Sequence, residues 1–293
     1  MDKLNYVTPQ VWKYNNLDDM LKNTKHRNSY YNNDNQKLSI PDISNNNFVC
    51  IVGEPGVGKS RLIDEIKVHI NGGLIFSVAA SFHSKMVVED KKYCIIDALD
   101  EVGDDQFFHK LQEIKRFRMD YPDVKIIFSC RRHYVASNAS HFSSLTDLSY
   151  IEIERFTNKD VDSVINNRCS VKTKESIDKS PKLRDLLSIP RYLVFLLELE
   201  EEKGECRSID ELFDYIITAS IKKTLTDKKD MANNDNNVIL IKRTLEKVAL
   251  VMEIGRRDYV SKDELYTILD GLKGNMAQML ISNFDLFFSR IES

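Results

Sequence analysis

An eight-residue stretch rich in glycine, GEPGVGKS at 53–60, follows directly on the apolar run FVCIV. It fits the pattern G-x-x-x-x-G-K-[ST], which binds phosphate where it connects a strand to a helix. The glycines at 53, 56 and 58 let the backbone fold into a hollow whose N–H groups point inward, and the following helix adds its positive N-terminus. A glycine-rich turn with an incidental lysine is the alternative, which the flanking strand and helix patterns disfavour. The stretch therefore predicts a phosphate-binding loop.

The side chains at the end of this loop supply the chemistry of a nucleotide site. Lys59 can reach the β- and γ-phosphates, and the Ser60 hydroxyl can coordinate Mg²⁺. Arg61 follows in the first helical turn, where a surface position is expected. The residues predicted to contact a bound nucleotide are Gly53, Glu54, Pro55, Gly56, Val57, Gly58, Lys59, Ser60 and Arg61.

A second acidic site is predicted at YCIIDALDE (93–101). Asp97 ends an apolar strand, where its carboxylate can lie beside the phosphate loop and hold Mg²⁺, often through water. Asp100 and Glu101 follow within one turn and can position or deprotonate the attacking water. The alternative is that these two residues only cap the helix that begins near Asp104. We assign Asp97 to the metal, and Asp100 and Glu101 to catalysis.

The next apolar run ends in FSCRRHY (128–134), and ligands meet an open parallel sheet at the carboxyl ends of its strands. Ser129, Arg131 or Arg132 could therefore contact the γ-phosphate, and we choose Arg131 as a catalytic residue. Exposure to solvent, or action on a neighbouring subunit, are the alternatives for the arginines. His133 is expected at the surface.

The elements that must position these residues alternate between strand and helix. Apolar runs are expected to form buried strands at 48–52, 73–79, 93–97, 124–130 and 150–156, with helices at 59–70 and 104–120. Strands that are apolar throughout and separated by helices indicate a parallel sheet covered on both faces. The fold class predicted for this part is α/β. Before it, a short helix is expected at 11–23, with Trp12 and Leu17 inward.

After residue 157 the pattern becomes helical. Thr157 is expected to cap the first helix, and Pro190 to mark a break between two later ones. Further helices are expected at 208–225, 238–255 and 261–272, the last capped by Ser261. The predicted organisation is an N-terminal extension or linker (1–47), a nucleotide-binding domain (48–157), a helical lid (158–207) and a winged-helix-like domain (208–293).

Composition narrows the class of protein. The 293 residues carry a formal charge of −3, which gives no global signal for nucleic acid or an anionic membrane. The five cysteines lie far apart without a CxxC pair, so neither a disulfide framework nor a zinc site is indicated. No signal peptide and no run of 18 apolar residues is present, so a cytoplasmic location is expected.

Several of these motifs resemble those of the STAND NTPases, specifically the NACHT type. CIIDALDE has their form hhhhDxxDE, close to the usual D-G-L-D-E with an alanine at 98. KIIFSCRR resembles their sensor strand, and IERFTNKDVDSVI the start of their helical domain. LRDLLSIPRYLVFLL resembles the helix pair whose proline, here Pro190, touches the adenine side of the nucleotide. YVSKDELYTIL is similar to part of their winged helix, so the resemblance extends over about 48–290.

The resemblance implies a P-loop sheet of strand order 5-1-4-3-2, followed by a helical lid and a winged helix. It also implies an ATP/ADP switch that requires Mg²⁺ and assembles into homo-oligomers when activated, in immune, antiphage (antiviral) or transcriptional signalling. Pro190 joins the predicted nucleotide contacts on this basis.

Three features depart from the family pattern. The connection AASFHSKMVVEDKK between the second and third strands is short, and no histidine follows His141, although the family often places one near the ADP phosphate. The chain shows no repeat array, and 47 residues precede the first strand. We expect a bare switch module that works with a separate protein partner, a sensor or an effector; a truncated product is the alternative.

The leading hypothesis is a regulatory ATPase with slow hydrolysis. One alternative is an AAA+-like DNA-remodelling ATPase, such as a loader or transposition helper, for which a basic stripe on the winged helix is expected; SKDELYTILDGLKG is acidic to neutral instead. Another is a scaffold that binds nucleotide for stability without turnover. A small-molecule kinase is disfavoured, because no acceptor pocket or cluster of lid arginines is evident.

Overall fold

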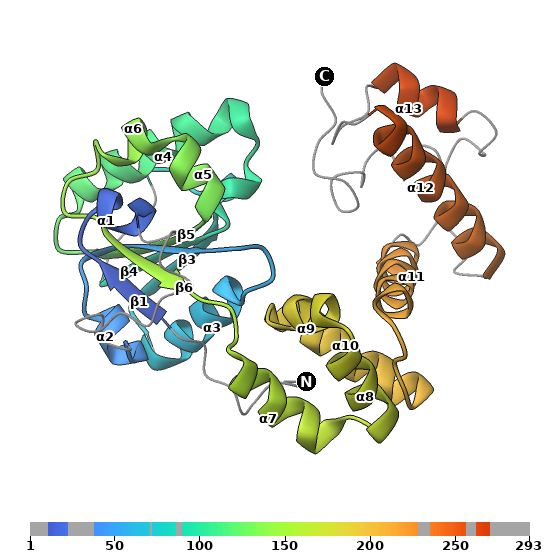
Figure 1. Cartoon of the computed structure of the whole chain (residues 1–293). Helices are drawn as coiled ribbons and strands as arrows, with labels where there is room; N and C mark the ends of the chain where they lie inside the picture. The colour runs from blue at the N-terminus through green and yellow to red at the C-terminus, as the bar shows by residue number, and fades with distance from the viewer. Residues whose placement is uncertain are drawn as a thin grey trace. The chain divides into compact units, whose positions relative to one another are not determined.

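The structure is a computed structural model that describes residues 11–22, 38–70, 72–85, 90–227, 235–255 and 262–269. The chain divides into two compact units, Met1–Cys206 and Arg207–Ser293 (Figure 1). The first holds a mixed sheet, its covering helices and a helical lid, and the second holds helices.

The first unit is organised by a six-stranded sheet. Its strands are β1 (Val11–Tyr14), β2 (Phe48–Gly53), β3 (Leu74–Val78), β4 (Tyr93–Asp97), β5 (Lys125–Arg131) and β6 (Ser149–Ile153). Their order across the sheet is β1-β6-β2-β5-β4-β3, and every pair is parallel except β1 with β6. Counted from β2, the five parallel strands have the order 5-1-4-3-2. The predicted α/β fold class and strand order are confirmed.

Helices cover both faces of this sheet because its central strands are apolar on both sides. All residues of β2 are buried. Helices α2 (Ile40–Ser44) and α3 (Lys59–Ile70) cover one face. The other face is covered by α1 (Leu17–Lys22), α4 (Asp104–Asp120), α5 (Arg132–Ser137) and α6 (Ala139–Phe142). Two short 3₁₀ turns, η2 (Ala79–Ser81) and η3 (Leu99–Glu101), follow β3 and β4.

The segment before the first parallel strand corrects one prediction. A helix was expected at 11–23, but Val11–Tyr14 forms β1, an antiparallel edge strand on β6, and the helix begins only at Leu17. β-Branched and aromatic residues suit a half-buried strand, and β6 offers them a free edge. Leu17 is buried as expected, whereas Trp12 is only half-buried, and its indole Nε1 is a buried donor without a partner in the described part of the chain. The N-terminal extension or linker predicted over 1–47 also contains α2, whose N-cap Ser39 forms a capping box with Asp42.

The helical lid comprises four helices, α7 (Asn158–Arg168), α8 (Val171–Lys179), α9 (Pro181–Leu187) and α10 (Pro190–Lys203). Thr157 caps α7 as expected, and its hydroxyl and the Asp160 carboxylate form a capping box. The expected break also occurs, because Pro190 opens α10 at a position where its missing N–H costs no hydrogen bond.

The second unit contains α11 (Ile209–Asp227), α12 (Asp235–Gly255) and α13 (Lys262–Leu269). The proposed cap Ser261 lies outside the described residues, as does all of the chain after α13, so a winged helix stays a prediction. No helix in the described ranges combines the length and the apolar character that crossing a membrane requires.

The five cysteines are free thiols, and all of them are buried. Burial raises the pKa of Cys94 to about 12, and burial, together with Glu200, raises that of Cys169 to about 12. Because the thiolate is the reactive form, these side chains act as small apolar groups of the core.

Candidate nucleotide site

The glycine-rich loop emerges from the carboxyl end of β2, between β5 and β6, and leads into α3 at Lys59. The backbone has φ +78° at Gly56 and +110° at Gly58, a region that side chains disfavour. The first turn of α3 carries N–H groups that have no acceptor within the helix, and its dipole adds positive charge there. The loop therefore has the backbone conformation that the motif predicts.

Lys59 is held at this loop by main-chain oxygens. Its Nζ donates hydrogen bonds to the carbonyls of Gly53 (3.0 Å) and Glu54 (3.1 Å). Burial lowers the pKa of the Lys59 ammonium from its usual value; Arg131 acts in the same direction, and Asp100 opposes it. An anion bound by the loop would compensate for this partial burial.

Asp97 lies at the end of β4 and is oriented by the neighbouring strand. The Ser129 hydroxyl on β5 donates to Asp97 Oδ1 (2.6 Å) and accepts from the Ala98 N–H (2.7 Å). Ala98 has φ +59°, which turns the chain sharply after the aspartate. Ser129 is buried and is therefore a positioning residue for Asp97 rather than a direct contact to a ligand.

Asp100 and Glu101 have different surroundings, although they are adjacent in sequence. Asp100 is buried, and both of its oxygens are taken by Arg131: Oδ2 by Nε and Oδ1 by the backbone N–H, each at 2.8 Å. Glu101 is exposed on the same 3₁₀ turn. Of the two, only Glu101 presents its carboxylate to solvent, while Asp100 fixes the position of Arg131.

The second arginine of the motif has a structural partner. Arg132 forms an ion pair with Glu152 on β6, and its Nη2 donates to the Met20 carbonyl on α1 (2.7 Å). This side chain, 13% exposed, joins the sheet to α1. His133 is exposed, as expected.

Arg61 and Ser60 both lie in the first turn of α3. Arg61 is half-buried, and its Nε contacts Glu65 Oε1 on the same helix at 3.3 Å. Ser60 is exposed at the loop, where its hydroxyl is available to a metal ion. Contacts of Arg61 with a nucleotide stay a prediction.

The lid touches the loop directly. The Arg191 N–H in the first turn of α10 donates to the Gly56 carbonyl (3.1 Å). A Cβ on Gly56 would lie 2.9 Å from Arg191 Cβ, so glycine is required there for this close approach as well. Pro190, next to this contact, is buried. The structure therefore brings Pro190 to the phosphate loop, and its contact with the base stays a prediction.

A further link joins Glu54 to Arg155, which follows β6. Arg155 Nε and Nη2 lie 2.8 and 2.7 Å from Glu54 Oε2. Sequence reasoning missed both Arg155 and the backbone contact of Arg191. Both lie in stretches that resemble the family, Arg155 in IERFTNKDVDSVI and Arg191 in LRDLLSIPRYLVFLL, but only the folded chain brings them to the loop.

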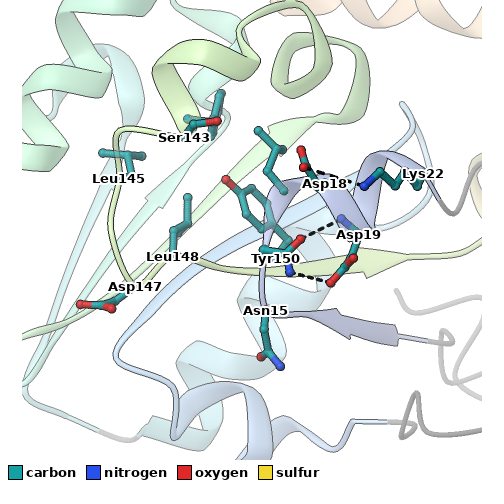
Figure 2. Close-up of a pocket in the computed structure, with 12 residues that line it drawn as sticks. Asn15, Asp18, Asp19, Lys22, Ser143, Leu145, Asp147, Leu148 and Tyr150 are labelled. Carbon is teal, nitrogen blue, oxygen red and sulfur yellow. Dashed lines mark hydrogen bonds and ion pairs between the residues drawn. The ribbon is translucent and has the colours of Figure 1, made fainter.

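A separate pocket of about 520 Å³ lies at the opposite end of the sheet (Figure 2). Figure 2 shows Asp18, Asp19 and Lys22 of α1 beside Tyr150, near the start of β6. Two of its carboxylates have local partners, since Asp18 lies 3.9 Å from Lys22 and Asp19 binds Asn16. No residue of the phosphate loop lines this pocket, so it is not the candidate nucleotide site.

Metal binding at the phosphate loop needs ligands from outside the protein. Within the described ranges, no group of three or more His, Cys, Asp or Glu side chains could hold a metal ion. Mg²⁺ ordinarily takes one or two protein ligands and completes its shell with water and phosphate oxygens. Ser60 at the start of α3 and Asp97 at the end of β4 fit that requirement, because Ser129 engages only one oxygen of Asp97.

These features define the class of the fold. A parallel sheet of order 5-1-4-3-2, a glycine-rich loop after its first strand and an aspartate at the end of its third are the P-loop NTPase arrangement. No family model and no curated protein matches the sequence.

Several solved structures have a similar fold at low sequence identity. The RuvB Holliday junction branch migration motor of Thermotoga maritima has 13% identity and a TM-score of 0.37, over 82% of this chain and 79% of that one. The ORC1 protein of Aeropyrum pernix, in complex with DNA, has 12% identity and a TM-score of 0.42, over 82% of this chain and 77% of that one. Domain III of the Thermotoga maritima replication initiation protein DnaA has 11% identity and a TM-score of 0.38, over 60% of this chain and 86% of that one. At these identities and TM-scores, the similarity concerns the fold alone.

Ser129→Ala should lower the free energy of unfolding by about 1–3 kcal/mol, because it leaves the buried Ala98 N–H and one oxygen of Asp97 without their partner. The measurement is equilibrium unfolding in urea. Ser143→Ala is the matched control: that hydroxyl is exposed and donates to its own helix, so the change should be within about 0.5 kcal/mol. Equal stabilities of the two variants would contradict the positioning role of Ser129.

Proposed function

We propose that this chain is an ATP-binding, Mg²⁺-dependent P-loop NTPase that hydrolyses ATP slowly and acts as a nucleotide-controlled switch. The observation that carries the proposal is the half-buried Lys59 ammonium, whose hydrogen bonds go to the carbonyls of its own loop. A triphosphate can replace those carbonyls with negatively charged oxygens, and such charge-assisted hydrogen bonds are stronger than neutral ones.

The residues of the site have distinct roles under this proposal. Lys59 and the loop N–H groups bind the phosphates, and Ser60 with Asp97 holds Mg²⁺. The bound metal ion neutralises charge that develops on the phosphate oxygens. Glu101 orients the attacking water and accepts its proton. Arg131, fixed by Asp100, approaches the γ-phosphate from the end of β5.

The role as a switch draws support from the contacts between loop and lid. A switch needs differential contacts in its two nucleotide states. The lid contacts the loop through the hydrogen bond from the Arg191 N–H to the Gly56 carbonyl, so a change in the loop conformation would change this contact. The finer reading is a STAND-type module, NACHT-like, that works with a separate sensor or effector and forms homo-oligomers when activated.

Lys59→Ala should weaken binding of Mg-ATP by more than about 100-fold, since hydrogen bonds to charged groups contribute about 1.5–3 kcal/mol each and a factor of ten is 1.4 kcal/mol. Isothermal titration calorimetry measures it. Lys67→Ala, two turns further along α3, is the control and should bind as the unmodified chain does. Tight binding of ATP by Lys59→Ala would overturn the assignment of the loop.

Glu101→Gln should reduce ATP turnover by about 10²–10⁴-fold while ATP still binds, because an amide cannot accept the proton. Its free energy of unfolding should stay within about 0.5 kcal/mol of the unmodified value, since Glu101 is exposed. Asp100→Asn should lose both turnover and stability, because Asp100 is buried against Arg131. Single-turnover hydrolysis and urea unfolding separate the two carboxylates. Undetectable turnover in the unmodified chain, together with nucleotide-dependent stabilisation, would favour a silent scaffold.

The DNA-remodelling alternative is decided by ATP turnover with and without duplex DNA at increasing salt. For a switch, DNA should leave turnover unchanged, because the described helix α13, KDELYTIL, offers no basic stripe. Stimulation that falls steeply with salt would replace the switch by a DNA-acting ATPase, since release of counterions makes such binding salt-dependent.

A further inference from the structure

Arg155 occupies the short connection between the sheet and the lid. β6 ends at Ile153 and α7 begins at Asn158, so Arg155 lies within four residues that join the two parts. Its guanidinium contacts Glu54 Oε2 through Nε and Nη2, and its Nη1 lies 3.7 Å from Asp185 Oδ2 on α9. One arginine therefore holds a carboxylate of the phosphate loop and approaches a carboxylate of the lid.

The two arms of this arginine differ in strength. The side chains of Arg155 and Glu54 are 36% and 28% exposed, and two nitrogens share one oxygen at short distance. Asp185 is 79% exposed and more distant, so water weakens that contact strongly. The contact with Glu54 is therefore the stronger of the two, and it holds the connection between β6 and α7 against the phosphate loop.

The loop is attached to the lid at a second point two residues away. The Gly56 carbonyl accepts from the Arg191 N–H, and the positive φ of Gly56 permits this approach. The residues around Lys59 thus contact both the entry to the lid, at Arg155, and the start of α10, at Arg191. Any rearrangement between Glu54 and Gly56 acts on both places.

Nucleotide binding must change the surroundings of Glu54. The Glu54 carbonyl accepts from Lys59 Nζ, a donor that phosphates would take over. The Glu54 carboxylate would also lie near several negative charges, which raises the importance of its cationic partner. Both changes act on Arg155 through its ion pair with Glu54.

We propose that the Glu54–Arg155 ion pair transmits occupancy of the phosphate loop to the helical lid, with Arg155 as the positioning residue at the connection. The inference rests on the proposed nucleotide binding and adds the specific contact through which binding moves the lid. Arg155 is not assigned to the nucleotide itself, so its loss should separate lid movement from binding.

The test uses spin labels on the full chain. All five native cysteines are buried, so labels should attach only at introduced ones, and the unsubstituted chain is the labelling control. Val68→Cys on α3 and Val171→Cys on α8 place one label on the sheet side and one on the lid, at side chains that are 81% and 70% exposed. Double electron–electron resonance measures the distance between them, and calorimetry measures binding of Mg-ATP.

In this labelled background, Mg-ATP should shift the distance distribution. Arg155→Gln should bind Mg-ATP with an affinity within about threefold of the background, a difference below 1 kcal/mol, and should lose most of the shift. Arg168→Gln is the matched control: Arg168 is 37% exposed and pairs with Glu201 inside the lid, so the shift should persist.

The outcomes are distinguishable. If the background does not bind Mg-ATP, the proposed function and the coupling both fall. If it binds but Arg155→Gln shifts as fully as the background, or if no shift occurs in the background, the coupling alone is overturned. Loss of binding in Arg155→Gln would overturn it too, by making Arg155 a direct contact. Should that variant fail to fold, Arg155→Lys decides, because one ammonium cannot reproduce two contacts: a reduced shift supports the coupling, and a full shift overturns it.

Discussion

The site depends on one half-buried positive charge, the ammonium of Lys59. Taking an ammonium out of water is unfavourable unless other groups compensate for the lost hydration. Here the Gly53 and Glu54 carbonyls provide partial compensation with neutral oxygens, and burial lowers the lysine pKa. The fold therefore holds a positive charge at the N-terminus of α3. The N–H groups of the first turn of this helix add partial positive charge in the same place. A polyphosphate would satisfy both features at once, which is why the loop, rather than the pocket at the other end of the sheet, is the candidate nucleotide site.

One strand sets the geometry of the acidic groups around this charge. Ser129 and Arg131 are two residues apart on β5 and therefore project to the same side. The first holds Asp97 and the second holds Asp100. β5 also lies directly beside β2, which carries the loop. The relative positions of Lys59, Asp97 and Arg131 are thus set by the sheet together with the side-chain contacts of Ser129 and Arg131.

The sequence was sufficient for features that depend on neighbouring residues, and insufficient for those that depend on distant ones. The phosphate loop, the strand ending at Asp97 and the Thr157 cap are encoded within a few positions, and all three were predicted. β1 was taken for a helix because its strand character requires β6 as a partner, more than 130 residues later in the chain. The different surroundings of Asp100 and Glu101 depend on the left-handed Ala98 and the 3₁₀ turn after it. Arg155 and Arg191 meet the loop only after the lid has folded.

The contact between Arg132 and the Met20 carbonyl bears on how the nucleotide-binding part can be isolated. The guanidinium pairs with Glu152 and donates to the Met20 carbonyl within α1, so residues 11–22 belong physically to the sheet. A fragment cut just ahead of β2 would strip β1 from β6, uncover apolar side chains such as Ile153, and leave an unpaired strand edge prone to aggregation. The smallest soluble piece therefore starts well upstream of its most recognisable motif.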